Sequence, residues 1–248
     1  MTAQDKSVPP TYALVTGGSG AIGRAICRTL AQAGHHVYVH ANSQLTAAQA
    51  LAEQLQHDGL HARAVAFDVT NAEATQQALQ GLLERGPIQI LVNNAGIHDD
   101  AVFPGMSAAQ WHKVIDVSLH GFFNVTQPLT MPMIRTRFGR IISISSVAAV
   151  MGNRGQVNYA AAKAALHGAS KSLAQELASR GITVNVVAPG IIESPMLEGN
   201  FPTEKIKQIV PMQRSGQPQE VGDLVAFLAS RKASYITGQV ISINGGMA

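Results

Sequence analysis

Apolar, β-branched runs alternate with segments of helical period along almost the whole chain. Seven short runs predict strands, at residues 12–16, 37–40, 62–67, 88–93, 140–145, 183–188 and 240–243. Between them, apolar residues recur at three- and four-residue spacing and predict helices over residues 21–33, 46–57, 72–84, 158–178 and 219–228. Gly34 and Gly181 stand close behind two of these stretches, where glycine commonly ends a helix.

The strand runs are apolar throughout rather than alternating, which is typical of strands buried on both faces of a sheet. Strict alternation of strand and helix therefore predicts an α/β protein of Rossmann type, a doubly wound parallel sheet of about seven strands with helices on both faces. No linker or repeat divides residues 1–248, so we expect a single domain with a flexible N-terminus over residues 1–10. Pro128 and Pro132 interrupt one further helical stretch, and a kink is expected there because an interior proline removes a backbone donor.

Composition narrows the class of protein. Charged residues make up only 13% of the chain, which hints at surface buried against other subunits, and the net charge of +3 comes from scattered basic residues. The sequence contains no run of Lys and Arg of the kind that would indicate binding to nucleic acid or to a membrane surface. The N-terminus has no apolar signal segment and no apolar run reaches the roughly 18 residues of a membrane span, so we expect a soluble, cytoplasmic protein. The nine histidines lack metal-ligand spacing, so no metal is expected.

The stretch "TGGSGAIGRA", residues 16–25, fits three phosphate-binding patterns. The P-loop pattern fails, because Arg24 and Ala25 occupy the places of its lysine and its Ser/Thr. Two dinucleotide patterns remain, G-x-G-x-x-G and T-G-x-x-x-[GA]-x-G, and both place a glycine-rich turn between the first strand and a helix whose N-terminus favours an anion. A tight turn without a ligand is the alternative interpretation of such a glycine cluster taken alone.

Other motifs decide between the two patterns. Residues 93–96 read "NNAG" after the fourth strand, residues 159–163 read "YAAAK" in a helix, and Ser146 stands thirteen residues before the tyrosine. In this order, and with "PG" at Pro189 and Gly190, the chain resembles the short-chain dehydrogenase/reductase family from about residue 12 to residue 247. The resemblance implies that Gly17, Ala21 and Gly23 fill the glycine positions of that family.

Residues 152–194 and the ending "YITGQVISINGGM" are similar to one branch of the family, the 3-oxoacyl-[acyl-carrier-protein] reductases. This resemblance implies reduction of a 3-oxoacyl group on acyl carrier protein to the 3-hydroxyacyl form, in fatty-acid or polyketide-type synthesis, by a homotetramer. A reductase of another small ketone is one alternative, and a dinucleotide-binding scaffold without activity is another. A scaffold is expected to have lost Tyr159 or Lys163, and both are present.

Four side chains are candidates for the chemistry. Tyr159 and Lys163 are four residues apart on a helix and so project from one face, where the ammonium is expected to lower the pKa of the phenol and suit it to acid–base work. The resemblance implies that Tyr159 protonates the ketone oxygen, that Ser146 holds the same oxygen, and that Lys163 also binds the nicotinamide ribose. In "WHKVIDVSL", Ser118 takes the place of a common family asparagine, and we expect it to help hold a water that links the lysine to solvent.

The stretch "VHANSQ", residues 39–44, bears on the choice of cofactor. It contains no carboxylate to repel a 2′-phosphate, while Asn42 and Ser43 can donate to one, which predicts a preference for NADPH over NADH. Gly20 stands where carrier-protein reductases often have arginine, so the predicted margin is modest. The resemblance implies that Asn93 and Ala95 line the ribose and adenine side of the cofactor, and a strand-end turn is the alternative for this pair. Asp68 matches the adenine contact of the family, and a helix N-cap is its alternative role. The full predicted cofactor set is Gly17, Ser19, Gly20, Ala21, Ile22, Gly23, Asn42, Ser43, Asp68, Val69, Asn94, Ala95, Gly96, Tyr159, Lys163, Pro189, Gly190 and Ile192.

Two arginines match the positions that the carrier-protein reductases use to dock the acidic carrier. These are Arg137, in "RTRFGR", and Arg180, in "LASRG". Arginine at a helix C-terminus also suits the helix dipole, so a purely structural role for either side chain is the alternative.

Overall fold

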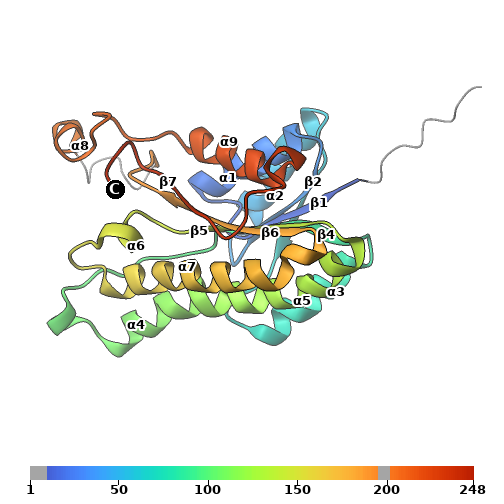
Figure 1. Cartoon of the computed structure of the whole chain (residues 1–248), viewed down its shortest axis with the longest axis horizontal. Coiled ribbons are helices and arrows are strands. Elements are labelled where there is room, and N and C mark those ends of the chain that lie inside the picture. The colour runs from blue at the N-terminus through green and yellow to red at the C-terminus, as the bar shows by residue number, and fades with distance from the viewer. Residues whose placement is uncertain (1–9, 195–201) are drawn as a thin grey trace, which may run out of the picture.

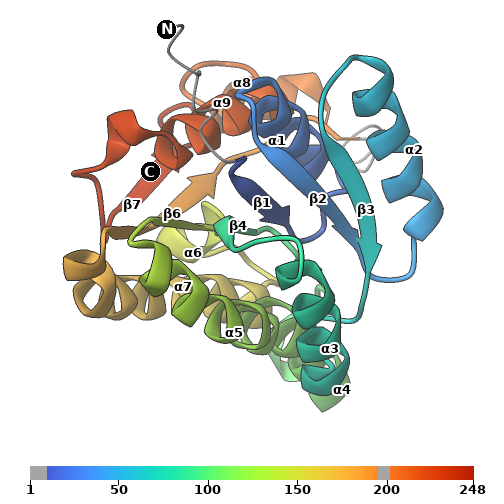
Figure 2. The same cartoon turned by 90° about the vertical axis from the view of Figure 1, so that its right-hand side faces the viewer.

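Seven parallel strands form one sheet across residues 10–194 and 202–248, the part of the chain that this computed structural model describes. Their order is β3-β2-β1-β4-β5-β6-β7, with β3 and β7 at the two edges (Figure 2). The strands are β1 (Tyr12–Val15), β2 (His36–Ala41), β3 (Ala62–Ala66), β4 (Ile88–Asn93), β5 (Gly139–Ile144), β6 (Ile182–Pro189) and β7 (Val240–Ile243). The predicted doubly wound parallel sheet is therefore confirmed.

Helices cover both faces of the sheet (Figure 1). One face carries α1 (Ala21–Gln32), α2 (Leu45–His57) and α9 (Pro218–Ala229), and the other carries α3 (Ala72–Leu83), α5 (Gly121–Thr136) and α7 (Val157–Leu177). Shorter helices are α4 (Ala108–Ile115), α6 (Ala148–Met151) and α8 (Thr203–Ile209). Every residue of β5 and β6 is buried between the two layers, which is the reason why these strands are not amphipathic in sequence.

The predicted boundaries lie within one residue of the observed ones for all seven strands and all five helices. Gly34 and Gly181 adopt the left-handed conformation after a helix, with φ of 89° and 77°. A side chain on Gly181 would in addition overlap the carbonyl oxygen of Arg137. The single domain remains a prediction, and all of the predicted flexible N-terminus except Pro10 lies outside the described residues.

Neither proline ends helix α5. The helix is continuous from Gly121 to Thr136 through Pro128 and Pro132, so the prolines do not divide it into two helices. The irregular turn lies directly before α5, at Asp116–His120, where a π-helical turn joins α4 to α5. This turn carries Ser118 and is of the kind that often marks a functional site.

Candidate active site

A cavity of about 710 Å³ opens at the C-terminal ends of the central strands. It spans the neighbours β1 and β4, where the strand order reverses, which is the place where open α/β sheets bind their ligands. Of the predicted cofactor residues, all except Asp68 and Val69 line it, and so does Ser146. Further lining residues are Ala41, Gln44, Ile97, Ile144, Ser145, Glu193 and Ser194.

Only some of the glycines in the loop after β1 are required for steric reasons. Gly17 has φ of 61°, and a Cβ on Gly23 would overlap the Gly17 carbonyl oxygen. A Cβ on Gly18 would lie 3.1 Å from the Cys27 sulfur beneath the loop, whereas a Cβ on Gly20 would meet nothing closer than 3.5 Å. Gly17 and Gly23, which the T-G-x-x-x-[GA]-x-G pattern uses, are therefore required by backbone packing, and Gly20 is open.

His40, at the end of β2, supports this loop from beneath. Its Nδ1 lies 3.1 Å from the Gly17 amide nitrogen and accepts that N–H, so its Nε2 carries the proton and donates to the Phe67 carbonyl oxygen at 2.8 Å. His40 is 1% exposed, and burial lowers its pKa, which keeps the ring neutral. This role was not predicted, although the position of His40 at the end of the second strand was a signal for it.

Asn94 ties the loop after β4 to the loop after β1. Its side-chain amide donates to the carbonyl oxygens of Thr16 and Gly17, each at 2.9 Å. In return, the Thr16 hydroxyl oxygen accepts the backbone N–H groups of Asn94 and Ala95, each at 3.0 Å. The predicted glycine loop and the "NNAG" motif thus form one hydrogen-bonded unit at the switch point of the sheet.

Strand β5 and helix α7 bring the three catalytic candidates together. Ser146 follows β5, and its side chain forms a hydrogen bond with Tyr159 of α7. Lys163, one turn further along α7, points its ammonium at the end of β5 and donates to the Ile144 carbonyl oxygen at 2.9 Å. The ammonium nitrogen lies 5.8 Å from the centre of the Tyr159 ring.

Burial controls the protonation of this group. Desolvation raises the pKa of Tyr159 above its usual range, and the hydrogen bond with Ser146 opposes this effect only in part. Desolvation also lowers the pKa of Lys163 to about 8. The pKa of Tyr159 therefore moves in the direction opposite to the expected lowering, and burial is the largest cause. The phenol is therefore protonated at neutral pH, as a proton donor must be, and the raised pKa makes it a weaker acid than a free tyrosine.

Ser118 lies close to Lys163 but has no partner of its own. Its hydroxyl is buried and forms no hydrogen bond within the described residues. A Cβ on Gly96 would lie 2.8 Å from the Lys163 ammonium nitrogen and 3.6 Å from the Ser118 hydroxyl oxygen, so both groups adjoin the same glycine. An unpaired hydroxyl beside a lysine, on a π-helical turn, fits the predicted role of holding a water.

Asp68 and Val69 of the predicted set do not line the cavity, and neither does Asn93, which was expected on the ribose and adenine side. Asp68 accepts the Thr70 backbone N–H at 2.9 Å, while the N-cap of α3 is Asn71, so the N-cap interpretation of Asp68 is wrong. Val69 packs its side chain in the core. Asn93 is buried and donates to the Thr126 hydroxyl at 3.0 Å, because neighbouring residues at a strand end point to different sides of the sheet.

The two candidate docking arginines lie together near the N-terminal ends of β5 and β6, whereas the cavity lies at the C-terminal ends of the strands. Arg137 ends α5 and donates to the Ser179 carbonyl oxygen at 3.3 Å, beside Arg180. Both side chains are exposed. Strand β5 separates them from Ser146, a distance of about 20 Å at about 3.3 Å per residue.

Two general features complete the description of the chain. Within residues 10–194 and 202–248, no group of three or more His, Cys, Asp or Glu side chains could hold a metal ion. In the same part of the chain, no helix has the length and apolar character needed to cross a membrane.

Known proteins match the chain over nearly its whole length. The family described as short chain dehydrogenase matches residues 11–205. A relative from Aggregatibacter actinomycetemcomitans, named 3-oxoacyl-[acyl-carrier-protein] reductase FabG, is 45% identical over 94% of this chain and 98% of its own length. A protein of the same name from Staphylococcus epidermidis is 43% identical over 95% and 98%, and a 3-oxoacyl-[acyl-carrier-protein] reductase from Synechocystis is 45% identical over 95% and 96%. With the glycine loop, Ser146, Tyr159 and Lys163 assembled around one cavity, this chain belongs to the short-chain dehydrogenase family.

Proposed function

We propose that this chain reduces a 3-oxoacyl group carried on acyl carrier protein to the 3-hydroxyacyl form, with NADPH as the cofactor, in fatty-acid biosynthesis. The observation that carries this proposal is the convergence of Ser146, Tyr159 and Lys163 at the cavity that begins at the glycine loop. Relatives that are named for this reaction support the choice of substrate.

The residues of the cavity fit a nicotinamide dinucleotide. The backbone of the loop after β1 can approach a pyrophosphate closely because Gly17 and Gly23 carry no side chain, and the N-terminus of α1 favours the anion. The residues from Asn94 to Ile97 line the cavity next to this loop, and Pro189, Gly190 and Ile192 line its other end. The cofactor, when bound, supplies a hydride.

The chain supplies the proton and the orientation of the ketone. Ser146 and Tyr159 share a hydrogen bond, so both hydroxyls can reach one substrate oxygen. Tyr159 is protonated at neutral pH and gives its proton to that oxygen as the carbonyl carbon is reduced. Lys163 and a water held near Ser118 then return a proton to the phenolate. Lys163, with a pKa of about 8, exchanges protons readily near neutral pH.

The preference for NADPH rests on the residues after β2. Asn42 and Ser43 line the cavity there, and Glu193, the only acidic residue among the described ones that line it, follows β6 instead. No carboxylate at the end of β2 is therefore placed to repel a 2′-phosphate or to select the free ribose hydroxyls of NAD. Gly20 stands where the carrier-protein reductases often have arginine, so no guanidinium at this position strengthens the preference. The space around Gly20 is open.

Carrier docking and assembly extend the proposal. Arg137 and Arg180 form an exposed basic pair without a carboxylate partner among the described residues, and such a pair suits an acidic carrier. Phe123 and Met131 are 63% and 54% exposed on α5, and Tyr235 is fully exposed, so apolar surface is available for a homotetramer. A polyketide-type pathway and a cytoplasmic location remain predictions from the sequence.

Turnover on two kinds of substrate tests the proposal. We expect kcat/KM for acetoacetyl-acyl carrier protein to exceed that for a free β-keto ester at least tenfold, with NADPH in both assays. Equal or higher values for the free ketone would favour the alternative, a reductase of another small ketone. Failure to turn over either substrate while NADPH binds would favour the dinucleotide-binding scaffold.

A further inference from the structure

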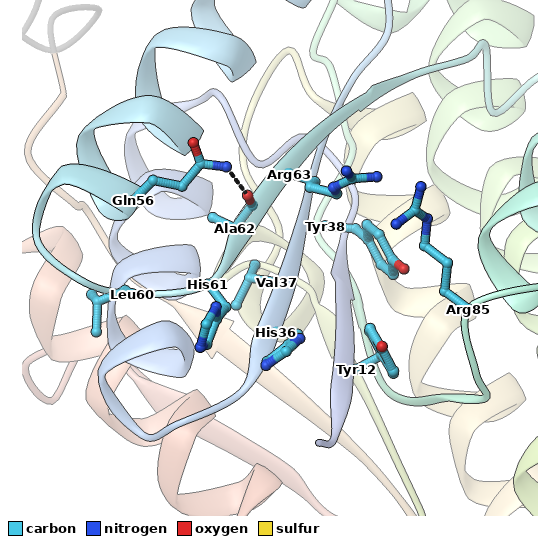
Figure 3. Close-up of a pocket in the computed structure, with 10 residues that line it drawn as sticks. All are labelled: Tyr12, His36, Val37, Tyr38, Gln56, Leu60, His61, Ala62, Arg63 and Arg85. Atoms are coloured by element: carbon cyan, nitrogen blue, oxygen red, sulfur yellow. Dashed lines mark hydrogen bonds between the residues drawn. The ribbon is translucent and has the colours of Figure 1, made fainter. Parts of the chain in front are cut away.

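A second cavity, of about 200 Å³, lies at the N-terminal ends of β1, β2 and β3 (Figure 3). The candidate active site lies at the other end of the strands, their C-terminal end. Strand register pairs Tyr12 with His36 and pairs Tyr38 with Arg63. Since side chains two residues apart on a strand share a face, Tyr12, His36, Tyr38 and Arg63 all lie on the face that α3 covers. Arg85, just after α3, closes the cavity from that side.

Aromatic rings form a rigid floor for this cavity. The rings of Tyr12 and Tyr38 stack with their centres 5.8 Å apart, and the His36 ring meets Tyr12 edge-on at 5.4 Å. Gly86 approaches Tyr12 so closely that an added Cβ would lie 2.9 Å from the ring. These contacts hold Tyr38 in one orientation.

The Tyr38 hydroxyl has no hydrogen-bond partner within the described residues, although Tyr38 is only 3% exposed. Buried hydroxyls are nearly always paired, so an unpaired one calls for an explanation. Figure 3 shows the guanidinium groups of Arg63 and Arg85 beside this ring, and both are close enough to act electrostatically on the phenol.

Positive charge in the cavity is not balanced. Neither the Arg63 nor the Arg85 guanidinium forms a hydrogen bond or an ion pair with any residue in 10–194 or 202–248. None of the described residues that line the cavity is acidic, and two of them are histidines, His36 and His61, whose rings lie 4.2 Å apart. The two exposed guanidinium forks therefore lie beside a buried, unpaired phenol hydroxyl, and none of these donors has an anionic partner among the described residues.

We propose that this cavity binds a phosphate group, either free phosphate or the phosphate of a small monoester, through Arg63, Arg85 and the Tyr38 hydroxyl. Arginine forks match phosphate oxygens in pairs, and the dianion offers acceptors for all three side chains at once. The volume of about 200 Å³ is below the 300–1,000 Å³ of sites for drug-sized ligands, so the organic part of a monoester is small. This site is separate from the dinucleotide cavity and does not depend on the proposed reductase activity.

Calorimetric titration of the full chain at pH 7.5 tests the site. Inorganic phosphate and phenyl phosphate are the two probes, with acetate as the monoanion control. We expect saturable binding of at least one phosphate probe and at least tenfold weaker binding of acetate. The stronger probe identifies the source of the phosphate. Absence of saturable binding for both phosphate probes at millimolar concentration would overturn the proposal.

Variants locate the binding. Arg63→Gln with Arg85→Gln should weaken phosphate binding at least tenfold, whereas Arg135→Gln, an exposed arginine on α5, is the matched control and should leave it unchanged. Tyr38→Phe should weaken binding without lowering the melting temperature of the free protein, because the hydroxyl has no partner there. Unchanged affinity in the double variant or in Tyr38→Phe would place the phosphate elsewhere and contradict the proposal. Circular dichroism confirms that each variant is folded.

Discussion

The ammonium of Lys163 donates a hydrogen bond to the carbonyl oxygen of Ile144 at 2.9 Å, at the end of a strand that is buried along its whole length. Helix α7 supplies the lysine and β5 the acceptor, so the contact fixes the catalytic face of the helix against the sheet. It also places a charged group where water is excluded, since Lys163 is 3% exposed. Chemistry and stability therefore oppose each other at this position.

Replacement of this lysine should reveal the cost of its burial. The pKa of Lys163 falls from 10.5 to about 8 in the folded protein. Between these two pH values the unfolded chain binds more protons than the folded protein, so the free energy of unfolding rises with pH. The free-energy cost of burying the charged lysine is therefore complete below about pH 8 and disappears as the pH approaches 10.5. We expect Lys163→Met to gain up to about 3 kcal/mol of unfolding free energy relative to the native protein at pH 7. That gain should shrink between pH 8 and pH 10.5.

Denaturant unfolding at a series of pH values measures this difference. Lys171→Met, an exposed lysine on the same helix, is the matched control. A gain that stays constant across this pH range would contradict the assignment of the burial cost to the charge of Lys163.

Loss of the tyrosine hydroxyl should stop the reaction. Tyr159→Phe removes the group that gives the proton and leaves the glycine loop unchanged, so turnover should fall by at least about a thousandfold, within the range of general acid catalysis. Dinucleotide affinity, followed by fluorescence, should stay the same. A variant that retains a tenth of the native turnover would show that another group protonates the ketone.

Ser118 should matter much less. Ser118→Ala should lower kcat by no more than about tenfold, or about 1.4 kcal/mol, because a water can keep other partners. Ser118→Asn, which restores the common family residue, should be tolerated. The free energy of unfolding should not fall in Ser118→Ala, since the hydroxyl has no partner within the described residues. Equal inactivity of Ser118→Ala and Tyr159→Phe would instead make the serine a direct proton-transfer residue.

Two glycines of the loop after β1 should respond in opposite ways. Gly23→Ala should abolish dinucleotide binding, because its Cβ would overlap the Gly17 carbonyl oxygen. Gly20→Arg has open space and adds a guanidinium, so it should strengthen NADPH binding over NADH binding by about tenfold through charge-assisted contacts. Dissociation constants of both cofactors measure the effect. A native kcat/KM for NADH that equals or exceeds that for NADPH would contradict the proposed cofactor preference.

Charge reversal at the docking pair should affect only large substrates. Arg137→Glu with Arg180→Glu should raise KM for the carrier-bound substrate about tenfold by repelling an acidic surface, and should spare a small soluble ketone. Arg135→Glu, exposed near the end of the same helix, is the control. Equal losses on both substrates would reject docking and favour a structural role for the arginines.

The order and boundaries of the elements could be predicted because their determinants are local. Continuously apolar runs, helical periodicity and terminal glycines each act within a few residues, so every predicted strand and helix lies within one residue of its observed position. The grouping of Ser146, Tyr159 and Lys163 was predictable from spacing and resemblance, because β5 and α7 deliver them to the same end of the sheet.

Other features depend on contacts between distant segments. The pKa of Tyr159 rises because the fold excludes water around it, and the distance in sequence to Lys163 carries no information about that burial. His40 supports the glycine loop only because β2 lies beside β1 and faces Phe67, which follows β3.

Asn93 and Asn94 show the division most clearly. The motif "NNAG" predicts a polar turn at the cavity, but one amide is buried against Thr126 of α5 while the next joins the glycine loop. Sequence alone determined that a polar pair ends β4. Which asparagine faces the site was decided by the tertiary structure, because the pleat of the strand and the packing of α5 assign the two side chains to different sides.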